Sequence, residues 1–359
     1  MSGNSIGKHF VVTCFGESHS KCVGIVVDGC PPGLELNEEI VQRELDRRRP
    51  QSERVSTTRR EEDKVQLLSG VFKGRTTGAP ITMLVWNRDV DSTPYEEYRW
   101  KPRPGHADYP ALIRYRGEND YRGGGRFSGR LTAALVMAGA IAKTYLQLKQ
   151  VEVLAYTVEV AGIRAQIPSE VKEIRERAAK NVMHCPDEEA EKRMEEAVTA
   201  ARKEGDSVGG IVECLALGMP PGVGDPLFDS LDADLAKMLF DIPAVKGVEF
   251  GSGFGAARLK GSENNDPYRI REGKVVTEMN NAGGILGGLT NGMPIVASVA
   301  FKPTPSISKR QRTVDLKGMM DADLEIGGRH DVCIVPRAVP VVEAAVAVVL
   351  VDHLLRLGL

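Results

Sequence analysis

The stretch His9–Gly29, HFVVTCFGESHSKCVGIVVDG, contains two short runs rich in β-branched and aromatic residues, His9–Gly16 and Cys22–Gly29. Such runs, bounded by turn residues, predict strands. A CPPG turn and an amphipathic helix over 37–49 follow, with Asn37 at its start and Pro50 after its end. Strands and helices are present, but there is no regular βαβ rhythm and no clean glycine loop after the first strand. The pattern therefore favours an α+β fold over a doubly wound sheet.

Two later segments, Leu131–Ala142 and Val339–Leu355, are strongly apolar. The first is too short to span a bilayer, and the second carries Glu343, Asp352 and His353, which are costly in hydrocarbon. We expect buried core helices and no membrane partner. The N-terminus lacks the basic flank, apolar region and cleavage site of a secretory signal, which predicts a cytoplasmic protein.

The composition bounds the class of protein. The chain has 359 residues, of which 42% are hydrophobic, enough for a substantial core in one large domain or two ordinary ones, and of these we expect a single domain over 1–359. A formal net charge of -2 argues against a protein that coats nucleic acid, so any positive field must be local. The six cysteines include no CxxC pair and are expected to be reduced thiols.

Three further patterns concern organisation. Residues 51–64 are polar and without periodicity, which predicts a long loop. Residues 166–205 are rich in charged helix formers, and we expect two surface helices, capped by Ser169 and Asp187, with Gly205 ending the second. Residues 123–142 and 327–350 both run Gly-Gly-Arg, a second arginine, and then a hydrophobic helix, which suggests the hypothesis of internal pseudo-symmetry.

The segment Arg103–Arg130, RPGHADYPALIRYRGENDYRGGGRFSGR, concentrates arginine, glycine and one histidine. His106 can titrate near neutral pH, and the arginines offer fixed charge and forked donors. Glycines 123–125 allow backbone amides to approach an anion, and the next helix begins directly after them. The segment predicts a phosphate site, and an arginine-rich surface loop is the alternative.

Other short motifs carry less information. Ser18 and His19 follow a predicted strand, but adjacent side chains on an extended chain point in opposite directions, so a turn role for Ser18 is as reasonable as chemistry. His19 becomes more informative if it meets His106 in space. His330 is more simply structural. No zinc-binding motif is present, so no metal is expected.

Glycine-rich loops also occur in the last third of the chain. FGSGFGA, residues 250–256, follows a predicted strand, but its last glycine spacing is wrong for a dinucleotide loop and no long apolar helix comes next. NNAGGILGGLTNG and FKPTPS bracket a strand. They could hold a planar cofactor and its phosphate, or form tight turns.

Taken together, the motifs resemble one family. The sequence is similar to chorismate synthases through ten motifs that occur in order over nearly the whole chain: FGESH, VDGCPPG, LDRRRP, RPGHADY, DYRGGGR, AVKGVEFGSGF, NNAGGILGG, FKPTPSI, GRHD and RAVPVVEA. The resemblance implies an enzyme that converts 5-enolpyruvylshikimate 3-phosphate to chorismate and phosphate by anti 1,4-elimination, at the end of the shikimate pathway. It also implies a requirement for reduced FMN without net redox change. The implied fold is an α+β sandwich with antiparallel sheets in the middle and helices outside, and the implied assembly is a homotetramer.

The resemblance assigns roles to individual residues. His19 matches the histidine thought to protonate the leaving phosphate, and His106 the one thought to protonate reduced flavin. Asp331 matches the acid implicated, with flavin N5, in removing the ring proton. Expelling phosphate requires that developing charge be neutralised, so arginine clamps are physically expected. The candidates for binding the substrate or NADP are Arg48, Arg54, Arg130 and Arg337.

The family's FMN positions fall on several separate loops. A reduced isoalloxazine stacked on the substrate can donate electron density to the breaking C–O bond, and the protein then supplies orientation and water exclusion. The matching positions are Arg126, Phe127, Ser128, Ala244, Gly287, Lys302, Pro303, Thr304, Pro305, Ser306 and Arg329.

The sequence departs from the family pattern at four places. Ser20 replaces a glycine after GESH, Phe127 stands in place of a serine, and Val332 replaces a proline after GRHD. The Phe127 change puts in doubt a side-chain hydroxyl contact to flavin. The loop around Arg54 is respaced, which makes that residue a weaker candidate than Arg48.

Two other classes of function remain open at this point. A nicotinamide-dependent dehydrogenase would use GSGFGA, and would bind NAD(P) without flavin. An RNA-binding module would use the arginine segment, with Tyr109, Tyr115 and Tyr121 as stacking platforms. The sequence has no large insertion for a second reductase domain, which favours external reduction of FMN over intrinsic reduction by NADPH.

Overall fold

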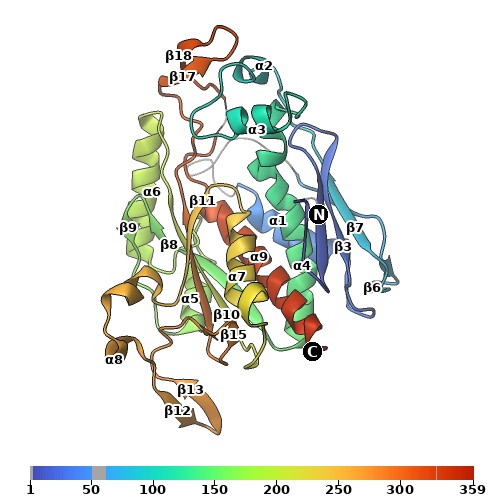
Figure 1. Ribbon diagram of the computed structural model, residues 1–359, viewed down its shortest axis with the longest axis vertical. Helices are drawn as coiled ribbons and strands as arrows, with labels where there is room; N and C mark the ends of the chain where they lie inside the picture. The colour runs from blue at the N-terminus through green and yellow to red at the C-terminus, as the bar shows by residue number, and fades with distance from the viewer. Residues whose placement is uncertain (1–2, 51–61, 329) are drawn as a thin grey trace.

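The framework of the protein is a pair of five-stranded antiparallel sheets with a layer of long helices packed between them (Figure 1). The computed structural model describes residues 3–50, 62–328 and 330–359. The predicted loop 51–64 therefore lies largely outside the described residues. One sheet is built from the first third of the chain and the other from its middle and later parts.

The first sheet contains the two runs that open the sequence. Its order is β1-β2-β3-β7-β4. β2 and β3 pair antiparallel, with Thr13 opposite Val26, and the turn between them carries Ser18 and His19 to one end of the sheet. The bounds are β1 (Ser5–Ile6), β2 (Val11–Gly16), β3 (Cys22–Asp28), β4 (Val65–Leu67) and β7 (Ile81–Trp86).

The second sheet has the order β11-β16-β10-β8-β9. Burial alternates along β16, as expected for a strand with one face on the core. The β11–β16 register shifts between Val245 and Gly247. This irregularity lies next to Ala244, one of the predicted cofactor-binding residues. The bounds are β8 (Glu152–Val160), β9 (Ile163–Arg164), β10 (Gly210–Leu217), β11 (Val245–Phe250) and β16 (Ile295–Phe301).

Four helices fill the space between the sheets: α1 (Glu38–Arg48), α4 (Thr132–Leu148), α7 (Leu231–Phe240) and α9 (Val335–Arg356). α4 and α9 pack directly together at Gly139, where an added Cβ would lie 2.3 Å from the Cβ of Ala344. Both helices are long and apolar enough to cross a membrane by length and composition, yet 94% of the most apolar stretch of α9 and 61% of that of α4 are buried inside the protein. The expectation of buried core helices is confirmed.

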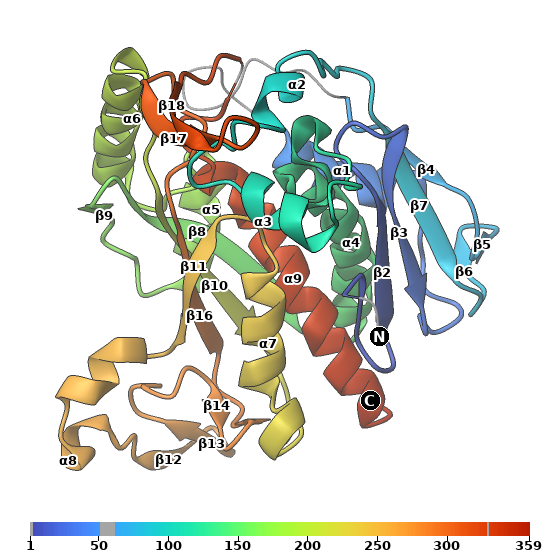
Figure 2. The same cartoon turned by 45° about the horizontal axis from the view of Figure 1, so that its top comes forward.

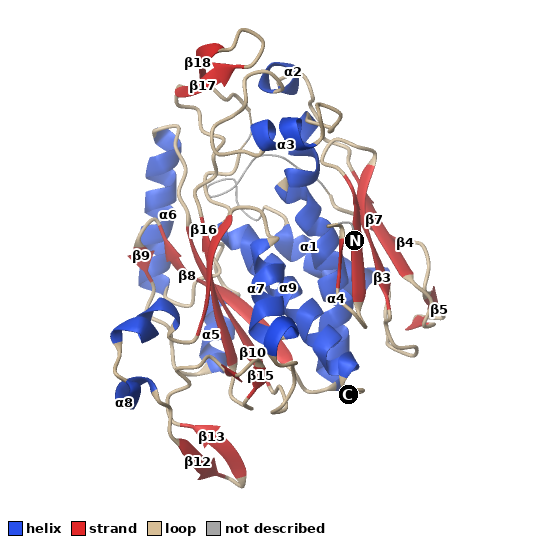
Figure 3. Cartoon of the chain, viewed as in Figure 1, coloured by secondary structure: helices blue, strands red, loops and turns tan. Residues whose placement is uncertain are grey.

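The order of the layers corrects one expectation. The α+β class and the antiparallel sheets are confirmed. However, the most apolar helices lie in the middle and the sheets flank them, rather than the reverse (Figure 3). The reason is that α9 is apolar around its whole circumference and must be covered on every side, whereas the first sheet needs cover on only one face.

Two charged helices do lie outside, against the second sheet. These are α5 (Val171–Ala178) and α6 (Glu188–Lys203), as the composition of this region predicts. Asp187 caps α6, since its Oδ1 accepts hydrogen bonds from Glu189 N and Ala190 N at 3.0 and 3.1 Å. Gly205 follows the end of α6 with a φ of +67°. The Ser169 cap is wrong, because α5 starts after Glu170 and has no side-chain cap.

The connectivity of the two sheets repeats. The order β2-β3-β7-β4 in the first sheet corresponds to β8-β10-β16-β11 in the second. α1 follows β3 as α7 follows β10, and α4 and α9 each come after the last strand of their sheet. This repeated topology agrees with the internal pseudo-symmetry suggested by the two similar sequence segments that lead into α4 and α9.

The remaining elements are short, and several gather over the N-terminal ends of α4 and α9 (Figure 2). The helical pieces are α2 (Tyr95–Tyr98), α3 (Asp108–Arg114), α8 (Gly261–Asn264), η1 (Arg122–Phe127), η2 (Gly129–Leu131), η3 (Leu227–Asp229) and η4 (Gly253–Arg258). The small hairpins are β5 (Val71–Phe72) with β6 (Arg75–Thr76), β12 (Tyr268–Arg271) with β13 (Lys274–Thr277), β14 (Ile285–Leu286) with β15 (Leu289–Thr290), and β17 (Gln311–Asp315) with β18 (Met320–Leu324).

Candidate functional site

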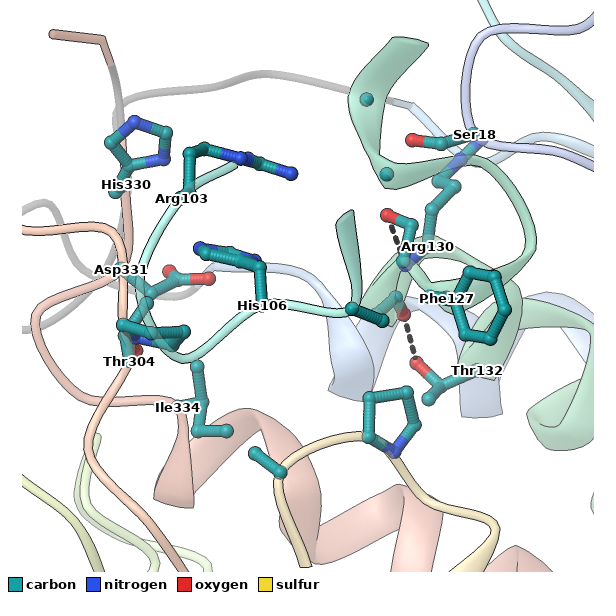
Figure 4. A pocket seen from close by; sticks show the side chains of 18 of the residues that line it. Ser18, Arg103, His106, Phe127, Arg130, Thr132, Thr304, His330, Asp331 and Ile334 are labelled. Carbon is teal, nitrogen blue, oxygen red and sulfur yellow. Dashed lines mark hydrogen bonds between the residues drawn. The ribbon is translucent and has the colours of Figure 1, made fainter. Parts of the chain in front are cut away.

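A cavity of about 760 Å³ lies where loops from both halves of the chain meet above the core helices. Its size is in the range of small-molecule and cofactor sites. In Figure 4, His106, His330 and Asp331 occupy one side of the cavity, and Arg130, Phe127 and Ser18 the other. The turn after β2, the end of α1, the arginine segment and the loops after β16 and before α9 all contribute to its lining.

Most of the residues predicted from the sequence line this one cavity. Pro303 and Ser306 lie in the same loop as Lys302 but are outside the lining set, and Ser306 still reaches it by a hydrogen bond to His106. The predicted residues in the lining are His19, Arg48, His106, Arg126, Phe127, Ser128, Arg130, Ala244, Lys302, Thr304, Pro305, Asp331 and Arg337.

Three predicted residues are not placed there. Gly287 lies in the turn between β14 and β15, which comes before the start of β16, whereas the cavity is at the end of β16. Gly287 therefore does not line this cavity, because the seven-residue strand β16 separates the two positions. Arg54 and Arg329 lie outside the described residues.

The cavity has an excess of positive charge. Its described lining includes nine arginine or lysine residues and six aspartates, although the whole chain has a formal net charge of -2. A locally positive, partly buried cavity favours anionic ligands. The local positive field expected from the sequence is thus concentrated at the predicted site.

His19 is held in one orientation by its neighbours. Its Nδ1 is 2.9 Å from Ser92 Oγ, and its ring meets Tyr95 edge-on with 5.2 Å between ring centroids. Gly123 lies against the other side, where an added Cβ would come within 2.2 Å of the imidazole; this residue also has a φ of +61°. Only glycine fits this position, which explains one glycine of the arginine segment.

His106 is on the opposite wall and is neutral. Burial and the nearby Arg103 guanidinium lower the pKa of His106 to about 3. Its Nε2 is 2.8 Å from Ser306 Oγ. Arg103 is itself fixed by Asp108, which accepts hydrogen bonds from Arg103 Nε and Nη2, each at 2.8 Å. A bound anion would raise the pKa of His106 and allow it to carry a proton.

Arg48 and Arg130 form a buried cluster around Asp63. Each guanidinium donates to one carboxylate oxygen of Asp63, and all three side chains are at most 5% exposed. Burial and the charge of Arg337 lower the pKa of Arg48 to about 9. Burial would raise the pKa of Asp63, but the two guanidiniums outweigh it and lower that pKa below its usual value.

Arg337 links this cluster to Asp331. Its Nη1 donates to Asp331 Oδ2, and its Nε donates to the carbonyl oxygen of Arg48 at 3.2 Å. Three arginines, Arg48, Arg130 and Arg337, therefore share two carboxylates. The remaining positive charge is the part of the cavity best suited to a phosphate or carboxylate group of a ligand.

The loop after β16 fits the edge of a polar, planar cofactor. Lys302 N donates to Ala244 O at 3.0 Å, and Lys302 Nζ donates to Gly105 O at 2.6 Å, so three predicted segments meet there. Thr304 Oγ1 is buried against the cavity with no hydrogen-bond partner among the described residues. An orphaned hydroxyl beside cationic groups fits the phosphate or ring oxygens of FMN.

The departures from the family pattern have local explanations. Ser20 Oγ donates toward the carbonyl oxygens of Glu17 and Cys22, both at 2.9 Å, and so closes the turn that carries His19. Phe127 lines the cavity and is 46% exposed, with its ring 6.4 Å from that of Tyr115. Val332 packs against the core, and its carbonyl oxygen accepts from Val208 N.

The structural contexts required by the alternative functions differ from those observed. The GSGFGA glycines follow β11, a strand of an antiparallel sheet, and lead into the six-residue η4 rather than a long helix. This is not the βαβ unit that holds a dinucleotide. Tyr121, one proposed stacking platform, instead donates its hydroxyl to Glu96 and packs with the Arg99 guanidinium.

The structure adds residues that the sequence patterns did not identify. Asp63 bridges two predicted arginines, Ser92 contacts His19, and Thr132 Oγ1 accepts from Arg48 Nε at 2.8 Å. The Asp63–Arg48 and Ser92–His19 partners are separated by 15 and 73 positions. No local spacing rule connects such residues, so the sequence held no signal for them.

Comparison with known proteins agrees with the geometry. The family model described as chorismate synthase matches residues 10–355. The chain is 53% identical over 356 residues to a chorismate synthase from Dehalococcoides mccartyi, covering 99% of this chain and 98% of the relative. It is 55% identical over 350 residues to one from Thermococcus kodakarensis, covering 98% and 97%. A solved structure titled "Crystal Structure of Chorismate Synthase" superposes with a TM-score of 0.77 at 30% identity, covering 98% of this chain and 93% of that one. The chain belongs to the chorismate synthase family.

Proposed function

We propose that the protein is a lyase that eliminates phosphate from 5-enolpyruvylshikimate 3-phosphate to give chorismate. The observation that carries this proposal is the convergence of His19, His106, Asp331 and three arginines on one positively charged cavity. The substrate has a phosphate and two carboxylates, and this cavity offers matching cationic groups. Fixed guanidiniums can stabilise the negative charge that develops on the departing phosphate.

The residues of the chain would divide the work as follows. Arg48, Arg130 and Arg337 bind the anionic groups of the substrate. His19, oriented by Ser92 and Gly123, presents its Nε2 to the leaving phosphate and supplies a proton there. Asp331 accepts the ring proton, and the hydrogen bond from Arg337 Nη1 holds its carboxylate in position.

We also propose that the cavity holds reduced FMN beside the substrate. The segment Lys302–Ser306, with Ala244 and Arg126, would hold the cofactor, as the orphaned Thr304 hydroxyl supports. When bound, reduced FMN would supply electron density to the breaking C–O bond. His106, placed by Ser306, would hold a proton at the edge of the ring system, and the surrounding walls would exclude water.

Further proposals concern the whole protein. It is expected to act as one domain in the cytoplasm and to form a homotetramer, and exposed apolar side chains such as Phe228, at 94% exposure, support burial against other copies. Reduction of FMN by an external donor is expected, rather than by NADPH bound to this chain. Static light scattering and an anaerobic NADPH oxidation assay test these two points.

The decisive experiment is anaerobic incubation with 5-enolpyruvylshikimate 3-phosphate and either photoreduced or oxidised FMN. Phosphate release and chorismate absorbance are both followed. We expect turnover with reduced FMN and none with oxidised FMN. FMN binding without turnover would require another substrate, and binding of NAD(P) in place of FMN would favour the dehydrogenase function instead.

A further inference from the structure

We propose that Asp63 is an internal counter-ion of the phosphate site, which keeps the affinity for inorganic phosphate low enough for the product to leave. This inference deepens the proposed function and rests on it for the identity of the anion. Asp63 was not among the residues expected from the sequence. Within the described part of the chain its side chain accepts hydrogen bonds from Arg48 and Arg130, and because it acts through these two arginines it is a positioning residue.

The geometry shows how Asp63 holds the arginines. Its Oδ2 accepts from Arg48 Nη1 at 3.2 Å, and its Oδ1 accepts from Arg130 Nη1. The other side of each guanidinium is also fixed: Arg48 donates to Thr132 Oγ1 and Gly129 O, and Arg130 donates to Asn87 Oδ1 and Trp86 O. The two forks are therefore preorganised before any anion binds.

The arginines still have donors to offer. A guanidinium carries five N–H groups, and the recorded bonds use three on each residue. A phosphate can thus bind to Arg48 and Arg130 while Asp63 stays in place. Under that arrangement the carboxylate and the phosphate face the same two cations, and like charges in one buried site repel strongly.

This repulsion has a function in a reaction that releases phosphate. Among the residues that the structure describes, loss of Asp63 would leave Asp331 as the one carboxylate paired with the three arginines of the cluster, and the site would bind a dianion more tightly. Tight binding that is equal for substrate and product does not raise turnover and slows release. Asp63 holds the donors in position for the transition state while lowering the affinity for the free product.

The chain offers a matched control. Glu44 is a second carboxylate that bridges two cations, at 2.9 Å from Arg47 and 2.7 Å from Lys143, and it does not line the cavity. Asp63→Asn and Glu44→Gln each remove one negative charge from between two cations. Only Asp63→Asn removes it from the phosphate site.

The test is calorimetric titration of the wild type and both variants with inorganic phosphate, without turnover. Asp63→Asn is expected to tighten phosphate binding by about tenfold or more, and Glu44→Gln to leave it unchanged. In steady-state assays, inhibition by added phosphate should strengthen by a similar factor. Phosphate affinity that is equal or weaker in Asp63→Asn, or equally tightened in Glu44→Gln, would overturn the proposal.

Folding of the variant is part of the same test. If Asp63→Asn is stable only when phosphate is present, the anion has replaced the carboxylate and the proposal is supported. If the variant is equally unstable with and without phosphate, the role of Asp63 is only structural and the proposal fails. If Asp63→Asn binds phosphate more tightly but the wild type forms no chorismate, the proposed reaction is contradicted and the counter-ion role of Asp63 is still supported.

Discussion

Arg47 and Arg48 are adjacent on α1 but belong to two different charge clusters, each built around a buried carboxylate. Arg47 pairs with Glu343 through two hydrogen bonds, at 2.6 and 2.9 Å, and Lys143 and Glu44 complete that group. Arg48 points to the cavity and meets Asp63. Both clusters pair arginines with a buried carboxylate, but only the cluster of Arg48 lines the cavity.

The difference lies in the charge balance. The cluster around Glu343 has two acids and two bases, so it is neutral, and none of its members lines the cavity. The cavity cluster has three arginines for two aspartates. A balanced buried cluster fixes packing, whereas an unbalanced one creates a site for an anion.

The largest effect is expected when the unbalanced cluster loses a cation. Arg48→Met should lower kcat/KM by about a hundredfold to a thousandfold, because one fixed donor to the developing phosphate charge is lost. Its thermal stability should change little, since the pKa of Arg48, lowered to about 9, shows that this cation is already disfavoured by burial and by Arg337.

The neighbouring arginine provides the control for this prediction. Arg47→Met should keep kcat/KM per folded molecule, because Arg47 does not line the cavity. Steady-state kinetics with reduced FMN measure both variants. Equal losses of kcat/KM in the two variants would contradict the division between the clusters.

The balanced cluster should respond in stability instead. Glu343→Gln should lower the free energy of unfolding by about 3 kcal/mol, because it leaves the partly buried Arg47 and Lys143 with less compensation. Burial would raise the pKa of Glu343, but Lys143 and Arg47 outweigh it and lower that pKa to about 2. This stabilisation is therefore present above about pH 4.5 and is lost as the pH falls towards 2.

Urea unfolding measured against pH tests the prediction for Glu343. The variant should show a flatter loss of stability than the wild type in that acid range. Its phosphate affinity should be unchanged. A variant as stable as the wild type at neutral pH would show that this cluster does not stabilise the core.

Burial of His106 should make the free energy of unfolding depend on pH. Its folded pKa of about 3 lies below the ordinary value of 6.5, so the unfolded state binds the proton first and stability falls as the pH drops below 6.5. Between pH 7.5 and 5 the wild type should lose about 1–2 kcal/mol more than His106→Gln. The same variant should have little turnover. If the wild type and His106→Gln had the same dependence of unfolding free energy on pH, the conclusion that burial lowers the pKa of His106 would be contradicted.

The smallest effect is expected at the start of α1, the helix whose last turn carries Arg47 and Arg48 into the two clusters. Asn37 Oδ1 accepts from Ile40 N at 2.9 Å and caps the helix. Asn37→Ala should lower stability by about 1 kcal/mol with kcat/KM and phosphate affinity unchanged. Thermal unfolding and calorimetry measure these quantities. A change in phosphate affinity would show that the helix start controls the position of Arg48.

Local patterns were sufficient for many elements and for the composition of the site. The alternating runs predicted β2 and β3, and Asn37 and Asp187 cap helices as expected. Most of the site residues that the ordered motifs named line the cavity. The Ser169 cap was wrong, because helix starts shift by a residue. Gly287 lies before the start of β16, away from the cavity at the end of that strand, and its role in binding FMN stays a prediction.

The sequence by itself determined the strands, the long apolar helices and the set of histidines, arginines and acids available for chemistry. Only the tertiary structure decided that the apolar helices lie between the sheets, that Arg47 and Arg48 face different clusters, and that Asp63 lies between Arg48 and Arg130. The physical reason is that strand and helix formation depends on neighbours along the chain. Burial and charge pairing instead depend on partners far apart, such as Arg47 and Glu343, which are separated by 296 positions.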